Sequence, residues 1–83
     1  MEKLTRVAYM TPSNMLDIKY GWSFIKDSSV VFIIPDGQNV ATVDDGFASC
    51  IYVDKEYCTF DNVDNRSDID IFNEISFNII KNL

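Results

Sequence analysis

Large apolar side chains alternate with small or polar ones along residues 16–24, which is the clearest pattern in the chain. The apolar positions are Leu16, Ile18, Tyr20, Trp22 and Phe24. The positions between them are Asp17, Lys19, Gly21 and Ser23. Successive side chains of a β-strand point to opposite faces, so this period of two predicts a strand with an apolar core face and a polar outer face. Gly21 is expected to mark a bulge or bend in so long a strand.

Other strands are predicted from short apolar runs bounded by turn residues. Thr11-Pro12-Ser13-Asn14, Asp27-Ser28, Pro35-Asp36-Gly37 and Asp44-Asp45-Gly46 are the predicted turns. In the third turn, Gly37 is suited to a positive φ. The segments between these turns favour further strands at 4–10, 29–34, 38–43, 47–53 and 56–60.

The last two of these strands are predicted to form a hairpin across Asp54-Lys55. With a two-residue loop, one face of the hairpin carries Phe47, Ile51, Cys58 and Phe60. Tyr52 and Tyr57 then pair on the other face, and Cys50 lies on that face as well. This register keeps the two cysteines unlinked, whereas a three-residue loop would place them opposite each other.

The apolar period changes to three and four residues after position 67, which predicts an amphipathic helix over about 68–82. The predicted apolar stripe consists of Ile69, Phe72, Ile75, Ile79, Ile80 and Leu83. Asp70, Glu74 and Lys81 fall on the opposite face. Ser67 and Asp70 have the spacing of a capping box, and Asp68 and Asp70 complement the positive end of the helix dipole.

Together these elements predict one α+β domain over residues 1–83. We expect an antiparallel, meander-like sheet of about five or six short strands, packed by one C-terminal amphipathic helix. A domain of this size buries only about 60 % of the surface of its unfolded chain, so close packing or oligomerisation is needed for stability.

The residue types that carry most protein chemistry are missing from the sequence. The chain has no histidine and only two cysteines, which excludes Ser-His-Asp and Cys-His catalysis and a structural zinc site. Its three glycines are isolated and form no phosphate-binding loop. Asp61, Asp64, Asp68 and Asp70 do not fit the calcium loop of an EF-hand, whether the loop is counted from Asp61 or from Asp64. We therefore expect no catalytic residue, no metal site, no cofactor and no enzymatic activity.

The net charge of −6 lies entirely in the second half of the chain. Residues 1–41 contain four acidic and four basic side chains, whereas residues 42–83 contain nine acidic and three basic ones. This distribution disfavours direct binding to nucleic acid or to an anionic membrane. The N-terminus does not resemble a targeting segment, and the longest apolar run, 30–35, is too short to span a bilayer. We expect a cytoplasmic protein.

The candidate binding residues are the acids between positions 54 and 74 together with two tyrosines. The acids are Asp54, Glu56, Asp61, Asp64, Asp68, Asp70 and Glu74. Tyr52 and Tyr57 fall on the outer face of the predicted hairpin, and tyrosines of this kind are favoured at interfaces. The acids either solubilise the protein or attract a basic partner, and rigidly held carboxylates can imitate phosphates.

These features favour a small non-enzymatic inhibitor that binds a basic protein, such as a nuclease or another nucleic-acid-binding protein. In size and charge alone the chain resembles phage anti-defence proteins, anti-CRISPR inhibitors among them, and bacterial immunity proteins. No motif carries this resemblance. Two alternatives remain: a homo-oligomer that sequesters a small molecule such as a nucleotide signal, and a small subunit of a larger complex. Phosphate ligands would need basic groups or a free helix N-terminus, and the predicted helix start is occupied by acids.

Overall fold

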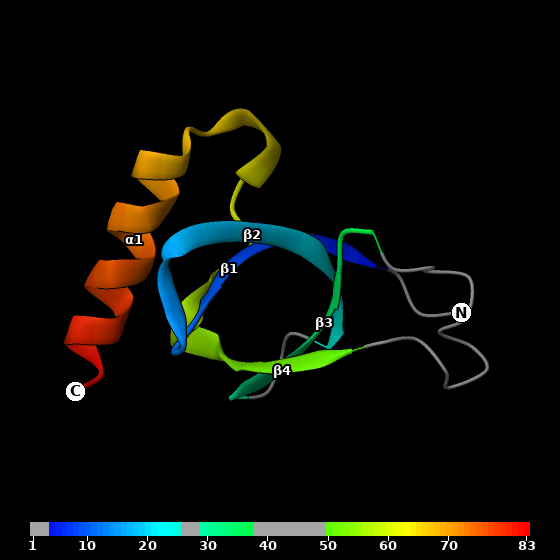
Figure 1. Ribbon diagram of the computed structural model, residues 1–83, viewed down its shortest axis with the longest axis horizontal. Helices are drawn as coiled ribbons and strands as arrows, with labels where there is room; N and C mark the ends of the chain where they lie inside the picture. Colours follow the sequence, from blue (N-terminus) through cyan, green and yellow to red (C-terminus); the bar gives the residue numbers. More distant parts are fainter. Residues whose placement is uncertain (1–3, 26–28, 38–49) are drawn as a thin grey trace.

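The computed structural model describes residues 4–25, 29–37 and 50–83, which form an antiparallel sheet and one long helix (Figure 1). The strands are β1 (Thr5–Thr11), β2 (Asn14–Ile25), β3 (Val30–Pro35), β4 (Ile51–Asp54) and β5 (Cys58–Thr59). A 3-10 turn, η2 (Lys55–Tyr57), connects β4 to β5, and a second, η3 (Val63–Asn65), follows β5. The helix α1 covers Asp68–Lys81. The predicted α+β class is therefore confirmed.

The strand order in the sheet is β4-β3-β2-β1-β5, so β1 to β4 form a meander and β5 returns to pair with β1. The outermost strands β4 and β5 are joined by the three residues of η2. Such a link spans at most about 15 Å, whereas the edges of a flat five-stranded sheet lie about 19 Å apart. The sheet must therefore curl, and Figure 1 shows β2, β3 and β4 bending around an enclosed interior.

The interior of this curl holds the first of two hydrophobic cores. Its buried members are Val7, Tyr9, Val31, Ile33, Val53 and Cys58, and the partly buried Ile51, Tyr57 and Phe60 pack against them. These residues come from β1, β3, β4, β5 and η2, so this core depends on contacts between segments distant in sequence.

The second core lies between the outer face of the sheet and α1. Ala8, Met10, Val63, Ile71 and Ile75 are its buried members, with Ile18, Tyr20, Phe72 and Ile79 partly buried around them. Because β1 contributes Val7 and Tyr9 to one core and Ala8 and Met10 to the other, this strand is apolar on both faces.

The curl overturns the prediction of a solvent-facing polar side only in the second half of β2, since Asp17 is exposed and Lys19 is half-buried. Ser23 is only 1 % exposed and Gly21 is buried, whereas Leu16, predicted to be in the core, is 90 % exposed near the β1–β2 turn. The curled sheet encloses one side of β2, and α1 covers only part of the other side, where Ile18 and Tyr20 pack as predicted.

Gly21 marks no bulge, since it pairs with Val7 and Pro35 in regular register, but it lies in a strand that bends (Figure 1) and it permits a close approach of two strands. A Cβ atom at this position would lie 2.5 Å from the carbonyl oxygen of Ile34 and 2.8 Å from Cγ2 of Ile33. The register of β2 against β3 shifts elsewhere, between Ser23 and Ile25. The predicted turn after β3 is confirmed, since Gly37 has a φ of 95°.

The predicted hairpin across Asp54-Lys55 is wrong, because β4 pairs with β3 and β5 pairs with β1. A two-residue hairpin turn needs positive φ at its central positions, but Asp54 has a φ of −60° and the chain continues into η2. Tyr57 consequently packs against the interior core, and Tyr52 does not pair with it. Ile51, Cys58 and Phe60 still contact one common core, as expected.

The predicted helix is confirmed in type and position, including its cap. The Ser67 hydroxyl accepts a hydrogen bond from the Asp70 backbone N–H over 3.2 Å. Of the predicted apolar stripe, Ile75 is fully buried and Phe72 and Ile79 are half-buried, whereas Ile69, Ile80 and Leu83 are exposed. Ile71, which the prediction left out of the stripe, is fully buried. The helix rests on the sheet with the side that carries Ile71, so the remaining apolar residues form a second, outward stripe.

Other predicted features lie outside the described residues: the strand 38–43, the turns at Asp27-Ser28 and Asp44-Asp45-Gly46, and Phe47. Within the described ranges, no helix has the length and apolar character needed to cross a bilayer.

Candidate interaction groove

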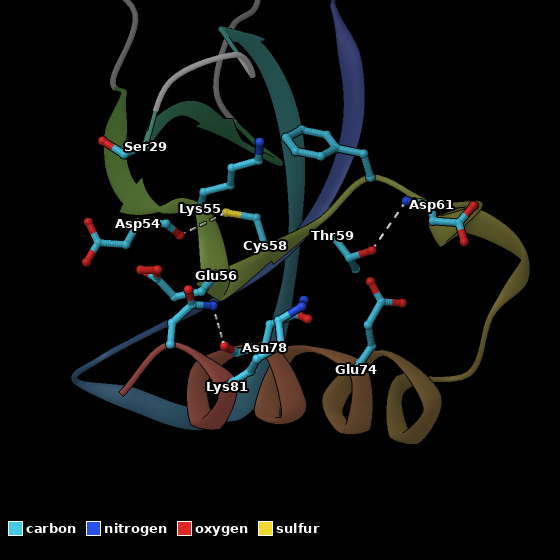
Figure 2. Close-up of a pocket in the computed structure, with 12 residues that line it drawn as sticks. Ser29, Asp54, Lys55, Glu56, Cys58, Thr59, Asp61, Glu74, Asn78 and Lys81 are labelled. Carbon is cyan, nitrogen blue, oxygen red and sulfur yellow. Dashed lines mark hydrogen bonds between the residues drawn. The ribbon is translucent and has the colours of Figure 1, made fainter.

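A groove of about 860 Å³ runs between η2 and β5 on one side and the C-terminal half of α1, from Glu74 onward, on the other (Figure 2). The walls combine short polar side chains, such as Thr59 and Asn78, with the partly buried ring of Phe60. It also includes four of the predicted acids: Asp54, Glu56, Asp61 and Glu74. We call this feature the acidic groove.

The acidic groove carries carboxylates toward both of its ends. Asp54 and Glu56 come from the η2 end, whereas Asp61 and Glu74 lie toward the other end, with Thr59 and Asn78 between the two pairs (Figure 2). Lys55 and Lys81 also line it, so its charged side chains sum to a formal charge of −2. Among the described residues, Asp54, Glu56 and Asp61 make no ion pair.

Arg66 fixes one end of the acidic groove. Its guanidinium contacts Asp70 at 2.7 Å and Glu74 at 2.6 Å, and it donates a hydrogen bond of 2.9 Å to the Asp61 carbonyl oxygen. These contacts hold the loop between β5 and α1 against the helix and orient the segment that carries Asp61. The two carboxylates raise the pKa of Arg66, mainly through the hydrogen bond from its guanidinium to Asp70.

The other predicted acids serve the fold and lie outside the groove. Asp64 accepts a hydrogen bond of 3.2 Å from Arg6, Asp68 accepts one of 2.6 Å from the Tyr20 hydroxyl, and Asp70 is paired with Arg66. Four of the seven acids therefore line the groove, and the other three join segments of the chain. Glu74, one of the four, is also bound to Arg66.

Arg6 is the centre of a second charged cluster, on the outer face of β1. Its guanidinium binds the Asp36 carboxylate through two hydrogen bonds, of 2.7 and 2.9 Å, and lies over the rings of Trp22 and Tyr20 at 5.1 and 5.6 Å. The hydrogen bonds from Arg6 hold the pKa of Asp36 below its ordinary value. This cluster connects the turn after β3 to η3 through Asp64.

Cys58 lines the groove but is not a reactive nucleophile. Its side chain is buried, and its thiol donates a weak hydrogen bond to the Asp54 carbonyl oxygen over 3.6 Å. Burial raises the pKa of Cys58 to about 12, so its thiol stays protonated at neutral pH. Cys50 and Cys58 are both free, as predicted.

The two candidate tyrosines lie in different environments. Tyr52 is 69 % exposed on β4, and its ring lies 4.5 Å from that of Phe32 on the neighbouring strand. Tyr57 is half-buried against the interior core. Neither lines the acidic groove, so the structure gathers part of the predicted acidic set at one place and leaves the tyrosines apart from it.

Sequence reasoning missed the residues that organise this surface. The spacing of Arg66, Asp70 and Glu74, each four residues from the next, was a local signal that part of the acidic segment is neutralised internally. The role of Arg6 had no such signal, because its partners lie 30 and 58 residues away.

A second hollow of about 780 Å³ lies beside β1, β2 and the end of β3, where Lys19 and Asp36 place one charge of each sign. Across the described part of the chain, no three His, Cys, Asp or Glu side chains converge as they would around a metal ion. The chain matches no protein-family model, no curated protein and no solved structure. Its function must therefore be argued from the acidic groove and the exposed surfaces themselves.

Proposed function

We propose that this protein is a small non-enzymatic inhibitor that binds a basic protein partner through the acidic groove. One observation carries the proposal: four carboxylates from the end of β4, η2, the loop after β5 and α1 line a single groove. Three of them make no ion pair among the described residues. The partner supplies a lysine- or arginine-bearing segment that enters between η2 and α1.

The chemistry of the groove suits a cationic side chain better than an anionic ligand. A guanidinium or ammonium group at either end meets two carboxylates, and charge-assisted hydrogen bonds of this type are about twice as strong as neutral ones. The apolar stem of the same side chain packs against Phe60. A nucleotide would instead meet a groove with a formal charge of −2 and a helix N-terminus that carries Asp68 and Asp70.

Inhibition follows if the partner normally binds a nucleic-acid backbone with the same basic segment. Carboxylates held on a rigid surface then compete with phosphates for it. Complementary charge also accelerates association, by about tenfold to a thousandfold at low ionic strength, and salt screens this effect. Nucleases and other nucleic-acid-binding proteins are the partner class that we propose.

The test is capture from a lysate on immobilised protein, with partners identified by mass spectrometry and their association rates measured at low and high salt. The groove variant is D54N/E56Q/D61N, which removes the three carboxylates without an ion pair. A matched control, D17N/D44N/D45N, removes three carboxylates from other parts of the sequence.

We expect a basic partner whose association with the groove variant is at least about tenfold slower at low salt, whereas the control binds nearly as wild type. Addition of the protein is expected to reduce nucleic-acid binding by that partner. Equal loss of binding in both variants would mean that the net charge of the protein, and not the acidic groove, attracts the partner. Equal retention of binding in both would exclude the acidic groove as the binding surface.

A further inference from the structure

The outward face of α1 carries a second apolar stripe that no described part of the chain covers. Ile69, Phe77, Ile80 and Leu83 are 71 %, 64 %, 67 % and 98 % exposed. At about 100° per residue the three that belong to α1, Ile69, Phe77 and Ile80, lie within an arc of about 80° on the side of the helix away from Ile71 and Ile75. Leu83 follows two residues after the helix ends. Exposed apolar side chains that share one side of a helix mark that side as a contact surface.

The spacing along this stripe is that of a helix that pairs with another helix. Ile69, Asn73, Ser76 and Ile80 follow one another at intervals of four, three and four residues. This is the repeat that places side chains in the seam between two packed helices. Asn73 is exposed and Ser76 is half-buried, so the centre of the seam is polar and its two ends are apolar.

The charges beside the stripe identify the partner as a second copy in antiparallel orientation. Asp70 and Lys81 lie on the same flank of the helix, within about 20° of each other, and are separated by three turns. Arg66, Asp70 and Glu74 together carry a net charge of −1, and Lys81 carries +1. An antiparallel pair places equal flanks together in reversed order, so Lys81 meets Asp70 of the second copy. A parallel pair would bring opposite flanks together and set Lys81 near Ile79 instead of an acid.

We propose that the protein forms a two-fold symmetric dimer through antiparallel pairing of α1 with α1 of a second copy. The register that aligns the stripe sets Ile69 opposite Ile80 of the second copy and Asn73 opposite its Ser76. Each apolar end then packs on an apolar end, and the two helix dipoles oppose each other favourably. The dimer uses the outward face of α1, shares only Lys81 with the lining of the acidic groove, and does not rest on the function proposed for that groove.

The first experiment measures association of the full chain by sedimentation equilibrium from about 1 µM to about 1 mM, a range over which small apolar interfaces associate. We expect a monomer–dimer equilibrium that I80E weakens at least about tenfold, because the substitution places a charge in the seam. The control Y52E introduces the same charge at an equally exposed aromatic on β4 and is expected to leave the dimer intact. Circular dichroism checks that both variants fold, and I69Q serves as a second seam variant.

The second experiment tests orientation by carbodiimide cross-linking of an equimolar mixture of unlabelled and ¹⁵N-labelled protein. We expect Lys81–Asp70 cross-links that join one light and one heavy peptide, since these residues lie about 16 Å apart along one helix and cannot react within a copy. A monomer over the whole concentration range, a dimer insensitive to I80E and I69Q, or cross-links between equivalent ends of two helices would each overturn the proposal.

Discussion

The Tyr20 hydroxyl donates a hydrogen bond of 2.6 Å to the Asp68 carboxylate, which joins the middle of β2 to the first turn of α1. The same carboxylate lies at the positive end of the helix dipole, so one acid both favours the helix and attaches it to the sheet. The acceptor is charged, which makes this bond stronger than a neutral one.

Tyr20→Phe is expected to lower the free energy of unfolding by about 1 kcal/mol at neutral pH, because it removes only the hydroxyl of a partly exposed residue. Urea denaturation measures this value. A change close to zero would mean that solvent replaces the bond without cost.

The same pair predicts a dependence on alkaline pH. The hydrogen bond to Asp68 raises the pKa of Tyr20 to about 12 from an ordinary value of 10.0. Because the pKa of Tyr20 is higher in the folded state, its hydrogen bond to Asp68 stabilises the protein fully below pH 10. This stabilisation is lost as pH rises toward 12. The stability difference between wild type and Tyr20→Phe should therefore shrink over this interval, as measured by denaturation at a series of pH values.

Gly21→Ala is expected to destabilise the protein by about 1–3 kcal/mol. Its Cβ would lie 2.5 Å from the backbone oxygen of Ile34, an atom that moves only with β3. Thermal unfolding measures the effect, and Gly37→Ala provides a contrast, since space is open around Gly37 and only its positive φ opposes the substitution. An unchanged melting temperature for Gly21→Ala would show that β2 and β3 separate easily.

Arg6→Ala is expected to reduce the sensitivity of the protein to acid. Arg6 lowers the pKa of Asp36 in the folded protein below its ordinary value of 3.8. The ion pair therefore stabilises the protein above pH 3.8, and this stabilisation is lost as pH falls through the lowered pKa of Asp36. Wild type should lose more stability than the variant between pH 6 and pH 3. Urea denaturation at both values checks this, with Trp22 fluorescence as the signal because Arg6 lies over that ring.

The two thiols are expected to react at very different rates with an aromatic disulfide reagent. Cys58 is buried and its pKa is raised to about 12, whereas Cys50 is half-buried. At pH 8 the native protein should be modified first at Cys50, and Cys58 should react only on unfolding. Peptide mass mapping after partial reaction identifies the site, and early modification of Cys58 would show that the wall of the groove opens readily.

The elements that local sequence specifies were predicted well. The helix from Asp68 and its cap at Ser67 depend on residues within one turn of each other. The strands β1, β2 and β3 follow from apolar runs and from turn residues such as Gly37, whose positive φ is a local preference. For the same reason, the pairing of Arg66 with Asp70 and Glu74 was within reach of the sequence.

Tertiary structure decided which faces are buried and which acids remain for binding. Period two shows that β2 has two faces, but the curl of the sheet enclosed Gly21 and Ser23 and left Leu16 in solvent. The positions of β4 and β5 depend on pairing with β3 and β1, so no local pattern distinguishes them from a hairpin. Likewise, Asp64 and Asp68 lie close to Asp61 in sequence, but they do not line the groove with it. Asp64 is bound by Arg6 and Asp68 by the Tyr20 hydroxyl. Sequence records local conformational preference and charge, whereas burial and long-range ion pairing arise only when distant segments pack together.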